Sequence, residues 1–471
     1  MSGSAISTTT PAKGAERSAR LPASGLAWAV YEGARTPYVI LIKVYIFIPY
    51  LATVLVGDPV RGQTLVAQLV MAYGLLSAFT SPLLGAALDR IGPRKPALAV
   101  ATALLVALIA SLWWAKPDGS GLPLSATCAV VFAAGLLFAY TEVLHNSMLP
   151  YAAPAAQTSA ASGLGLALGS ALSVVLLAAV LWGFALPAKM ALPGFPAAPL
   201  LGLSAAAHET DRITAPIVAV VFALGALPLF LVGKDAPRGL GGGGVRDAFA
   251  GVWRMLKALK TNRPMAIFLG SRMLYTDGMT AILLFTGVYA AGVMGWSALE
   301  LLSLGVIVSV FLSFGGLLGA RLDRAFGPKR AIQIELAIVI VGQILLLGLA
   351  PGRLLYAPWS PEPVWNGPVF RSAPEIAFVA IACLNALGIC GSYASSRSML
   401  TKLSTPEDIG GWFGLYALSG TATVWLGSAL VGAATAAFGA QQAGFVVLLG
   451  LLIAGSVGMA FLPFNSGREF R

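Results

Sequence analysis

The chain has 471 residues, of which 58% are hydrophobic and only 10% are charged, and its formal net charge is +11. A water-soluble globule of this size needs more polar surface than this composition supplies, so the chain is predicted to lie in a lipid bilayer. The positive charge would suit nucleic acid only if the basic residues gathered on a soluble domain, which the sequence lacks. We therefore expect no nucleic-acid partner.

Apolar stretches long enough to cross about 30 Å of hydrocarbon recur along the whole chain. A helix satisfies its own backbone hydrogen bonds in lipid, so the spanning elements are predicted to be helices. The fold class is therefore an all-α membrane protein with two pseudo-symmetric six-helix bundles. The twelve predicted transmembrane helices lie near residues 26–56, 62–86, 95–115, 122–149, 158–184, 213–233, 264–292, 298–320, 329–350, 374–399, 408–437 and 441–463.

The predicted domains follow from this pattern. The first 25 residues are polar, rich in Ser and Thr, and lack the apolar core and cleavage site of a secretory signal. Most of the 30 Lys and Arg residues fall on one side of the predicted topology, and the positive-inside rule then makes both termini cytoplasmic. We expect a location in a bacterial inner membrane. The domains are a disordered cytoplasmic tail (1–25), an N-terminal bundle (26–233), a cytoplasmic linker (234–263), a C-terminal bundle (264–463) and a cytoplasmic tail (464–471).

The first predicted helix carries three charged residues, Glu32, Arg35 and Lys43, within about 80° of one another on a helical wheel. Ionisable residues inside a membrane are costly, so by default they are candidates for a transport site. Arg35 and Lys43 leave an excess of positive charge, which suits an anionic or carboxylate-bearing substrate. The alternative is an ion-pair network that only holds helices together.

One phrase occurs twice in the chain. LLGAALDRIGPRK at 83–95 returns as LLGARLDRAFGPKR at 317–330, each time between the second and third helices of a half. Repetition in phase with a six-plus-six topology is typical of transporters whose two bundles rock about a midplane site. The residues predicted to form the cytoplasmic gate are Gly85, Asp89, Arg90, Gly92 and Arg94 in the first copy, and Gly319, Asp323, Arg324, Gly327 and Lys329 in the second.

In the fourth predicted helix, Glu142 and His145 lie about one turn apart. A carboxylate beside an imidazole shares or passes a proton, so this pair is predicted to couple transport to protons. A solvated or merely hydrogen-bonded histidine near the inner interface is the alternative.

The linker contains four consecutive glycines and then an amphipathic stretch over 245–261. Its cations are expected to face the anionic headgroups of membrane lipids.

The seventh predicted helix repeats the pattern of the first. Arg272 and Asp277 occupy the symmetric position and are predicted to line the substrate cavity. Glu335 and Arg397 lie closer to the inner ends of the ninth and tenth helices, where snorkelling to the interface is expected.

Other chemistries find little support in the residue pattern. Cys128, Cys383 and Cys390 lie in predicted helices without metal-ligand spacing, and the two histidines, His145 and His208, form no metal or nucleophilic constellation. No nucleotide-binding loop occurs. We expect no metal, no cofactor and no enzymatic activity, and a monomeric protein.

The repeated pattern G-x-x-x-D-R-x-G-x-R/K resembles the signature loop of the major facilitator superfamily. This resemblance implies that the acid of each loop braces the gate against the other half, Asp89 near 408–409 and Asp323 near 158–159. WAVYEGARTPY at 28–38 and YTDGMTAILLFTGVYAAGVMG at 275–295 further resemble the vacuole-effluxer-like branch, which includes vacuolar amino-acid effluxers linked to autophagy.

The predicted function is a secondary active transporter of a small polar or anionic solute, with amino acids as the candidate that the resemblance implies. Alternating access moves the solute, and protons are the candidate coupling ion. Two alternatives remain open. One is a multidrug or lipophile exporter, and the other, from a different class, is a transport-fold sensor or lipid scramblase.

Overall fold

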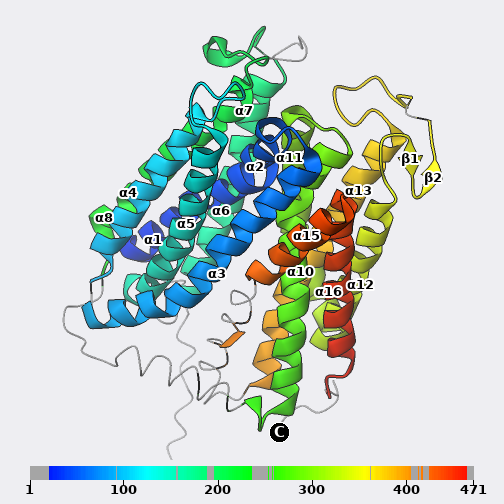
Figure 1. Ribbon diagram of the computed structural model, residues 1–471. Helices are drawn as coiled ribbons and strands as arrows, with labels where there is room; N and C mark the ends of the chain where they lie inside the picture. Colours follow the sequence, from blue (N-terminus) through cyan, green and yellow to red (C-terminus); the bar gives the residue numbers. More distant parts are fainter. Residues whose placement is uncertain are drawn as a thin grey trace, which may run out of the picture.

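The structure is a computed structural model that describes residues 21–91, 93–154, 157–187, 196–235, 259–360, 362–404 and 424–463, together with residues 253, 257, 412, 415, 416 and 419. The described part is helical apart from one short β-hairpin. Figure 1 shows two groups of long helices lying side by side, the first built from the first half of the chain and the second from the second half.

The N-terminal helix group contains six passages through the bundle, several of them interrupted by π or 3-10 turns. Its elements are α1 (Ala23–Pro37), η1 (Tyr38–Tyr45), α2 (Phe47–Tyr50), η2 (Leu51–Leu55), α3 (Pro59–Ile91), α4 (Lys95–Ser111), η3 (Leu112–Trp114), α5 (Leu124–Ala152), α6 (Thr158–Val180), η5 (Leu181–Ala185), η6 (Leu200–Gly202), α7 (Glu209–Arg212) and α8 (Thr214–Val232).

The C-terminal helix group repeats this arrangement. Its elements are α10 (Arg263–Val293), α11 (Ala298–Phe326), α12 (Pro328–Leu347), β1 (Arg353–Leu354), β2 (Ala357–Pro358), α13 (Ala373–Leu403), α15 (Val424–Phe438) and α16 (Gln441–Ala460). The strands pair antiparallel. We call the end of the molecule that carries this β-hairpin the hairpin end. The opposite end, which carries the turns at Pro93 and Gly327, is the repeat end.

Eleven of the described helices are long and apolar enough to cross a membrane, and α15 is a shorter apolar helix. The prediction of an all-helical membrane protein is therefore confirmed. Local sequence explains many of the boundaries. Ser297 and Glu300 form a capping box at the start of α11, and Ser372 and Glu375 do the same for α13. Gly327 has φ +78°, a conformation that favours glycine, and it lets α12 begin directly after α11 ends.

The first passage differs from the regular helix expected over 26–56. It follows an α-helix only as far as Pro37 and continues as the π-helix η1, where the Ile46 amide donates to the Leu41 carbonyl at 2.9 Å. Proline supplies no backbone donor, so a regular α-helical ladder is broken at this point. π-Helical turns are rare and occur frequently at functional sites. Arg35 lies in the α-helix before this break, and Lys43 lies in the π-helix after it.

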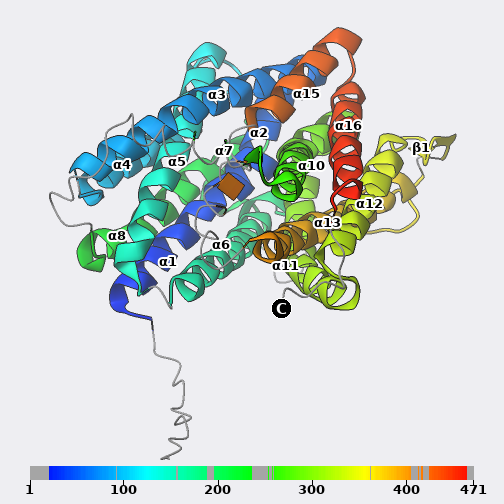
Figure 2. The same ribbon diagram turned by 90° about the horizontal axis from the view of Figure 1, so that it is seen from below.

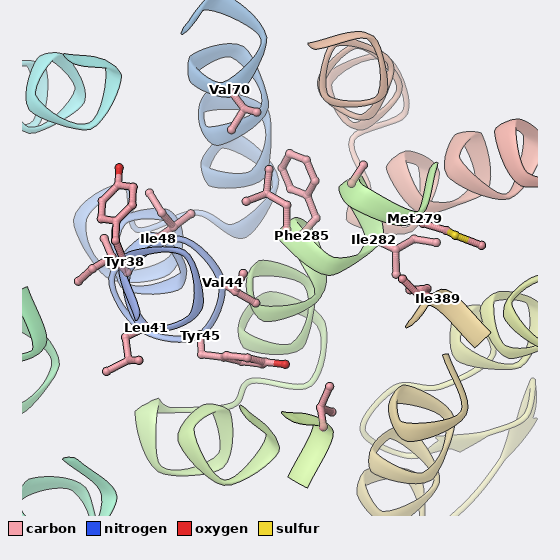
Figure 3. Close-up of a cluster of buried hydrophobic side chains, with 14 of the residues drawn as sticks. Tyr38, Leu41, Val44, Tyr45, Ile48, Val70, Met279, Ile282, Phe285 and Ile389 are labelled. Atoms are coloured by element: carbon pink, nitrogen blue, oxygen red, sulfur yellow. The ribbon is translucent and has the colours of Figure 1, made fainter. Parts of the chain in front are cut away.

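The two helix groups meet mainly towards the hairpin end. There, α3 packs along α15, and the Gln63 amide donates to Thr435 Oγ1 at 2.8 Å and to the Gln441 carbonyl at 3.0 Å. Further along, η1 packs against α10 and α11 of the other group; Figure 3 shows Val44 directed towards α10, and the Tyr45 ring lies against Gly305 of α11. Towards the repeat end the groups diverge (Figure 1), and Figure 2, seen from below, shows α1 and α10 near the centre of the bundle.

Small residues let α1 and α6 approach closely, and this contact supports a prediction. A Cβ added at Gly169 would lie 2.3 Å from Thr36 Oγ1, whereas one added at Gly163 on the same helix meets nothing within 4 Å. Both alanines raise helix propensity by about 1 kcal/mol. We therefore expect Gly163→Ala to hold or raise the unfolding temperature in detergent, and Gly169→Ala to lower it by overpacking worth about 1–3 kcal/mol. Equal unfolding temperatures for the two variants would contradict the close packing.

Candidate functional site

Four charged or titratable side chains from two helices form one cluster in the N-terminal helix group, in which Arg35 and His145 are buried and Glu142 is half exposed. Arg35 Nη2 lies 2.9 Å from Glu32 Oε2, and Arg35 Nη1 lies 3.5 Å from Glu142 Oε2 on α5. Glu32 Oε2 is also 3.3 Å from His145 Nδ1, again on α5. We call Glu32, Arg35, Glu142 and His145 the charge cluster. The sequence placed the two pairs on separate helices, and the fold brings them together.

His145 is fully buried, so a solvated histidine at the interface is wrong, whereas its hydrogen bond with the Trp28 carbonyl oxygen fits the alternative of a merely hydrogen-bonded histidine. Its ring is stacked against Trp28, with centroids 4.2 Å apart, and against Tyr31, with centroids 4.6 Å apart. The predicted partner of His145 also changes. The carboxylate beside Nδ1 belongs to Glu32, whereas Glu142, whose side chain is 46% exposed, contacts Arg35. An i, i+3 spacing places two residues on one helix face, but it does not decide which neighbouring helix competes for them.

The contacts of His145 indicate that one proton lies between its Nδ1 and the Glu32 carboxyl. Its Nε2 lies 3.0 Å from the Trp28 carbonyl oxygen, which only accepts, so Nε2 carries a hydrogen. Nδ1 is the second ring nitrogen, and it faces the Glu32 carboxyl. Two lone pairs facing each other repel, so this contact is attractive only when a proton resides on Nδ1 or on the Glu32 oxygen.

Lys43 lies further along the same passage, against aromatic rings. Its ammonium is 5.1 Å from the Tyr73 ring centroid and 5.8 Å from that of Phe138. Arg35 lies over the same Phe138 ring, 4.6 Å from its centroid. Among the described residues, no carboxylate lies within ion-pair distance of Lys43. The two cations are therefore joined by one aromatic ring, and only Arg35 has acidic partners.

A small cavity of about 20 Å³ lies beside Lys43, large enough for about one water molecule. Its other walls are apolar or aromatic and come mainly from the first passage, α3 and α5, with one residue from α10. The lining residues are Tyr38, Ile42, Lys43, Ile48, Val66, Leu69, Val70, Tyr73, Leu112, Val131, Ala134 and Leu284.

Sequence reasoning missed the aromatic residues that hold these charges. Trp28, Tyr31 and Phe138 were not predicted as site residues, although Trp28 and Tyr31 precede Glu32 and Arg35 at helical spacing. That spacing was the available signal, because residues three and four apart share a helix face. Phe138 had no such signal, since it comes from α5 and meets the cations only in the folded chain.

The charges of α10 have different partners from those of α1. Arg272 donates to the Tyr416 carbonyl at 2.8 Å and to Ser419 Oγ at 2.7 Å, and it lies 3.5 Å from the Tyr416 ring centroid. Asp277 is buried on the same helix. Within the described ranges, no ion pair joins Arg272 to Asp277 or either of them to the charge cluster.

The basic residues at the end of each copy of the repeated phrase form hydrogen bonds between the same two helices of their group, the third and the sixth. The backbone amides of Arg94 and Lys95, at the start of α4, donate to the Asp235 carboxylate just after α8, at 2.8–3.0 Å. In the other group, Lys329 Nζ at the start of α12 donates to the Ala460 and Leu462 carbonyls at the end of α16. In each group the start of the third passage is thereby tied to the end of the sixth.

The other predicted gate residues are placed as follows. Gly85, Asp89 and Arg90 lie on α3 with side chains outside the described part, and Gly92 lies outside the described residues. Gly319 packs closely on Gly391, Arg324 Nε donates to the Ala320 carbonyl, and Gly327 forms the turn already noted. The amphipathic stretch 245–261 is described only at isolated residues.

The structure also corrects the placement of Glu335. Snorkelling to the interface was expected, but the residue is completely buried on α12. Its carboxyl lies against the glycines of two neighbouring helices, which give it room to turn inward. Arg397 is exposed, in agreement with the expectation for that residue.

A larger cavity of about 450 Å³ lies between the two groups at the hairpin end. The N-terminal group contributes Tyr50, His208 and Asp211 to its wall, and the C-terminal group contributes Trp296 and Ser297. His208 Nδ1 lies 2.8 Å from Asp211 Oδ2. No residue lines both cavities, although the first passage contributes to each, with Ile42 and Lys43 in the smaller and Ile46 and Pro49 in the larger.

Comparison with known proteins agrees with this architecture. The model of the family described as "Vacuole effluxer Atg22 like" matches residues 65–470. No curated protein matches the chain at a significant level.

Among solved structures, a D-xylose-proton symporter has a TM-score of 0.63 at 14% identity, covering 94% of this chain and 96% of its own. A nucleoside transporter, NupG, has a TM-score of 0.61 at 14% identity, covering 94% and 99%. A fucose:proton symporter of E. coli has a TM-score of 0.52 at 14% identity, again covering 94% and 99%. At this identity the likeness shows a shared fold.

Proposed function

The chain belongs to the Atg22-like vacuole effluxer family, and from this membership and its buried charges we propose that it transports amino acids or other small carboxylate-bearing solutes. The chain is a multi-pass membrane transporter with the major facilitator fold, and it is not an enzyme. The solved relatives with this fold carry a pentose, a nucleoside or a deoxysugar. The fold therefore does not determine the substrate, and we infer the substrate class from the residues of the site.

The observation that carries the proposal is the arrangement of Arg35 and Lys43 about Phe138. Arg35 has Glu32 and Glu142 beside it, while Lys43 has aromatic rings and a cavity but no carboxylate within ion-pair distance among the described residues. Lys43 is partly buried within a membrane-spanning segment, where a cation is expensive unless paired. In the observed packing this cavity holds about one water molecule, so the solute enters it only when the two helix groups rock apart. Its carboxylate beside Lys43 then supplies the missing charge, and the aromatic walls accommodate its apolar part.

Protons are the proposed coupling ion, and Glu32 and His145 the proposed proton site. A proton held between His145 Nδ1 and Glu32 Oε2 makes the contact attractive, and its loss leaves Glu32 to pair with Arg35 alone. Arg35 also lies over Phe138, so a change at Glu32 is transmitted to the ring that Lys43 shares. Arg272 and Asp277 are proposed to contribute from the opposite wall in the C-terminal group.

We further propose that the repeat end faces the cytoplasm of a bacterium, with the two copies of the repeated phrase as its gate. Support comes from the concentration of Lys and Arg at this end and from the divergence of the two groups there. In alternating access the groups rock until this end closes and the hairpin end opens. The 450 Å³ cavity at the hairpin end then marks the start of the opposite entrance.

One observation favours a second candidate, the export of lipophilic anions. Apart from Lys43, the cavity wall consists of apolar and aromatic side chains with few polar groups. Such a wall suits an amphipathic anion as well as an amino acid. A thermal-shift screen of purified protein against amino acids, organic acids, sugars and lipophilic anions separates the two, because a bound ligand raises the unfolding temperature.

The test of coupling uses full-length protein in liposomes with the solute that this screen identifies. We expect His145→Gln to remove the response of solute uptake to a pH gradient while exchange of labelled for unlabelled solute continues. Glutamine keeps a side-chain amide near Glu32 but does not bind the shared proton. Glu142→Gln is the matched control on the same helix and should keep the response. Uptake by His145→Gln that still follows the gradient would remove this proton site.

A further inference from the structure

Outside the charge cluster, the C-terminal helix group contains a buried carboxyl group, that of Glu335. Glu335 lies on α12, about two turns from the repeat end, and its relative exposure is 0%. Ser395 Oγ on α13 donates a hydrogen bond to Oε1 at 3.1 Å. Within the described part of the chain, the other oxygen, Oε2, is buried without a hydrogen-bond partner.

Within the part of the chain that the structure describes, no cation pairs with this acid. None of the ion pairs within 4.0 Å among the described residues involves Glu335. On its own helix, Lys329 Nζ is directed to the carbonyls at the end of α16, and Arg330 is exposed. α16 packs against α12 but carries no titratable residue.

The titratable groups on the other neighbouring helices add no positive charge at the carboxyl. Asp323 on α11 acts on Glu335 as a like charge, and its own Oδ1 is buried without a partner in the described part. On α13, Cys390 faces the same region and Arg397 is exposed. Tyr275 on α10 is the remaining group that interacts with it electrostatically.

These surroundings decide the protonation state. A carboxylate taken out of water with one hydroxyl donor, no cation and a second acid nearby is far more costly than a neutral acid that leaves one hydroxyl unpaired. The carboxyl therefore holds a proton while the helices are packed as seen.

The Glu335 carboxyl is enclosed by the two neighbouring helices, α11 and α13, so it reaches water only if these helices separate. A Cβ added at Gly391 on α13 would lie 2.7 Å from Glu335 Oε1, and one at Gly319 on α11 would lie 3.1 Å from it. The carboxyl thus fills a slot between two glycines, and Gly319 belongs to the second copy of the repeated phrase. When the two copies are aligned on Pro93 and Pro328, Val100 falls opposite Glu335, and Val100 is 62% exposed. The acid is therefore absent from the N-terminal copy of this corner.

We propose that Glu335 is a proton-binding site of the C-terminal helix group, protonated while α11, α12 and α13 are packed together and deprotonated when this corner opens to water at the repeat end. The proton leaves the carboxyl for water, and the resulting carboxylate beside Asp323 disfavours reclosure. This site goes beyond the coupling pair Glu32 and His145, because it lies in the other group and binds its proton whether or not a substrate is present.

The experiment measures the infrared spectrum of the full-length protein in detergent as a function of pH, with no substrate present. We expect the band of a neutral carboxylic acid at pH 7, a decrease of this band in Glu335→Gln, and no decrease in Glu362→Gln, which removes an exposed acid. A folded state that keeps a proton which the unfolded chain releases is stabilised at low pH. The unfolding temperature of the unaltered protein should therefore fall as pH rises above about 4.3, and this fall should be reduced in Glu335→Gln.

A second variant keeps the proposal open to refutation if Glu335→Gln does not fold. Ser395→Ala removes the one donor that stabilises the carboxylate, so the band should persist to higher pH, with proton binding about tenfold tighter. Absence of the band in the unaltered protein at pH 7, or a band unaffected by both substitutions, would overturn the proposal. None of these outcomes depends on transport, so a failure here leaves the proposed function standing.

Discussion

Lys43→Gln is expected to raise the substrate KM about 10- to 100-fold in liposomes, with little change in the unfolding temperature. A charge-assisted hydrogen bond contributes about 1.5–3 kcal/mol, and each 1.4 kcal/mol is a factor of ten in binding. No described carboxylate depends on Lys43 for charge balance, because none lies within ion-pair distance of it; its ammonium lies against the rings of Tyr73 and Phe138. The variant therefore removes a substrate contact without leaving a buried acid unpaired.

Two controls make this result specific. Lys43→Arg keeps the positive charge and should retain a KM closer to that of the unaltered protein. Lys402→Gln removes an exposed lysine on α13 and should leave transport unchanged. If Lys43→Gln transported with an unaltered KM, the cavity beside Lys43 would not be the substrate site, and the role of Arg35 would have to be reconsidered as well.

Arg35→Gln is expected to have the largest effect on stability, about 3–5 kcal/mol, since breaking a buried ion pair leaves an uncompensated charge. Arg35 is 5% exposed and balances Glu32 directly, with Glu142 3.5 Å away. Its loss also removes the cation from the face of Phe138. Thermal unfolding of purified protein in detergent measures this effect before any transport assay is attempted.

The double variant Glu32→Gln with Arg35→Gln provides the control. It removes both charges of the closest pair and should recover much of the stability lost in Arg35→Gln alone, since Glu142 is half exposed and remains solvated. Recovery would show that the loss came from an unpaired carboxylate rather than from lost packing on Phe138. An Arg35→Gln protein as stable as the unaltered one would mean that the charge cluster is solvated.

Helices were predicted with greater success than partners. The turn at Gly327 and Pro328 and the starts of α11 and α13 follow from local chemistry, in which a cap, a proline or a glycine acts within a few residues. The π-helix Tyr38–Tyr45 was not predicted, because the spacing of apolar residues indicates a helix but does not reveal a local change in its period. Glu335 was misplaced because its burial depends on glycines of α11 and α13, far from it in the sequence.

The sequence by itself determined the membrane location, the helical fold, the repeated phrase and the identity of the charged residues inside the bundle. Each of these depends on composition or on spacing along one helix, where geometry is set by the backbone. Only the tertiary structure decided that His145 faces Glu32, that Arg35 and Lys43 share Phe138, and that Glu335 is enclosed. These are contacts between helices, and side chains distant in sequence compete for them when the chain packs.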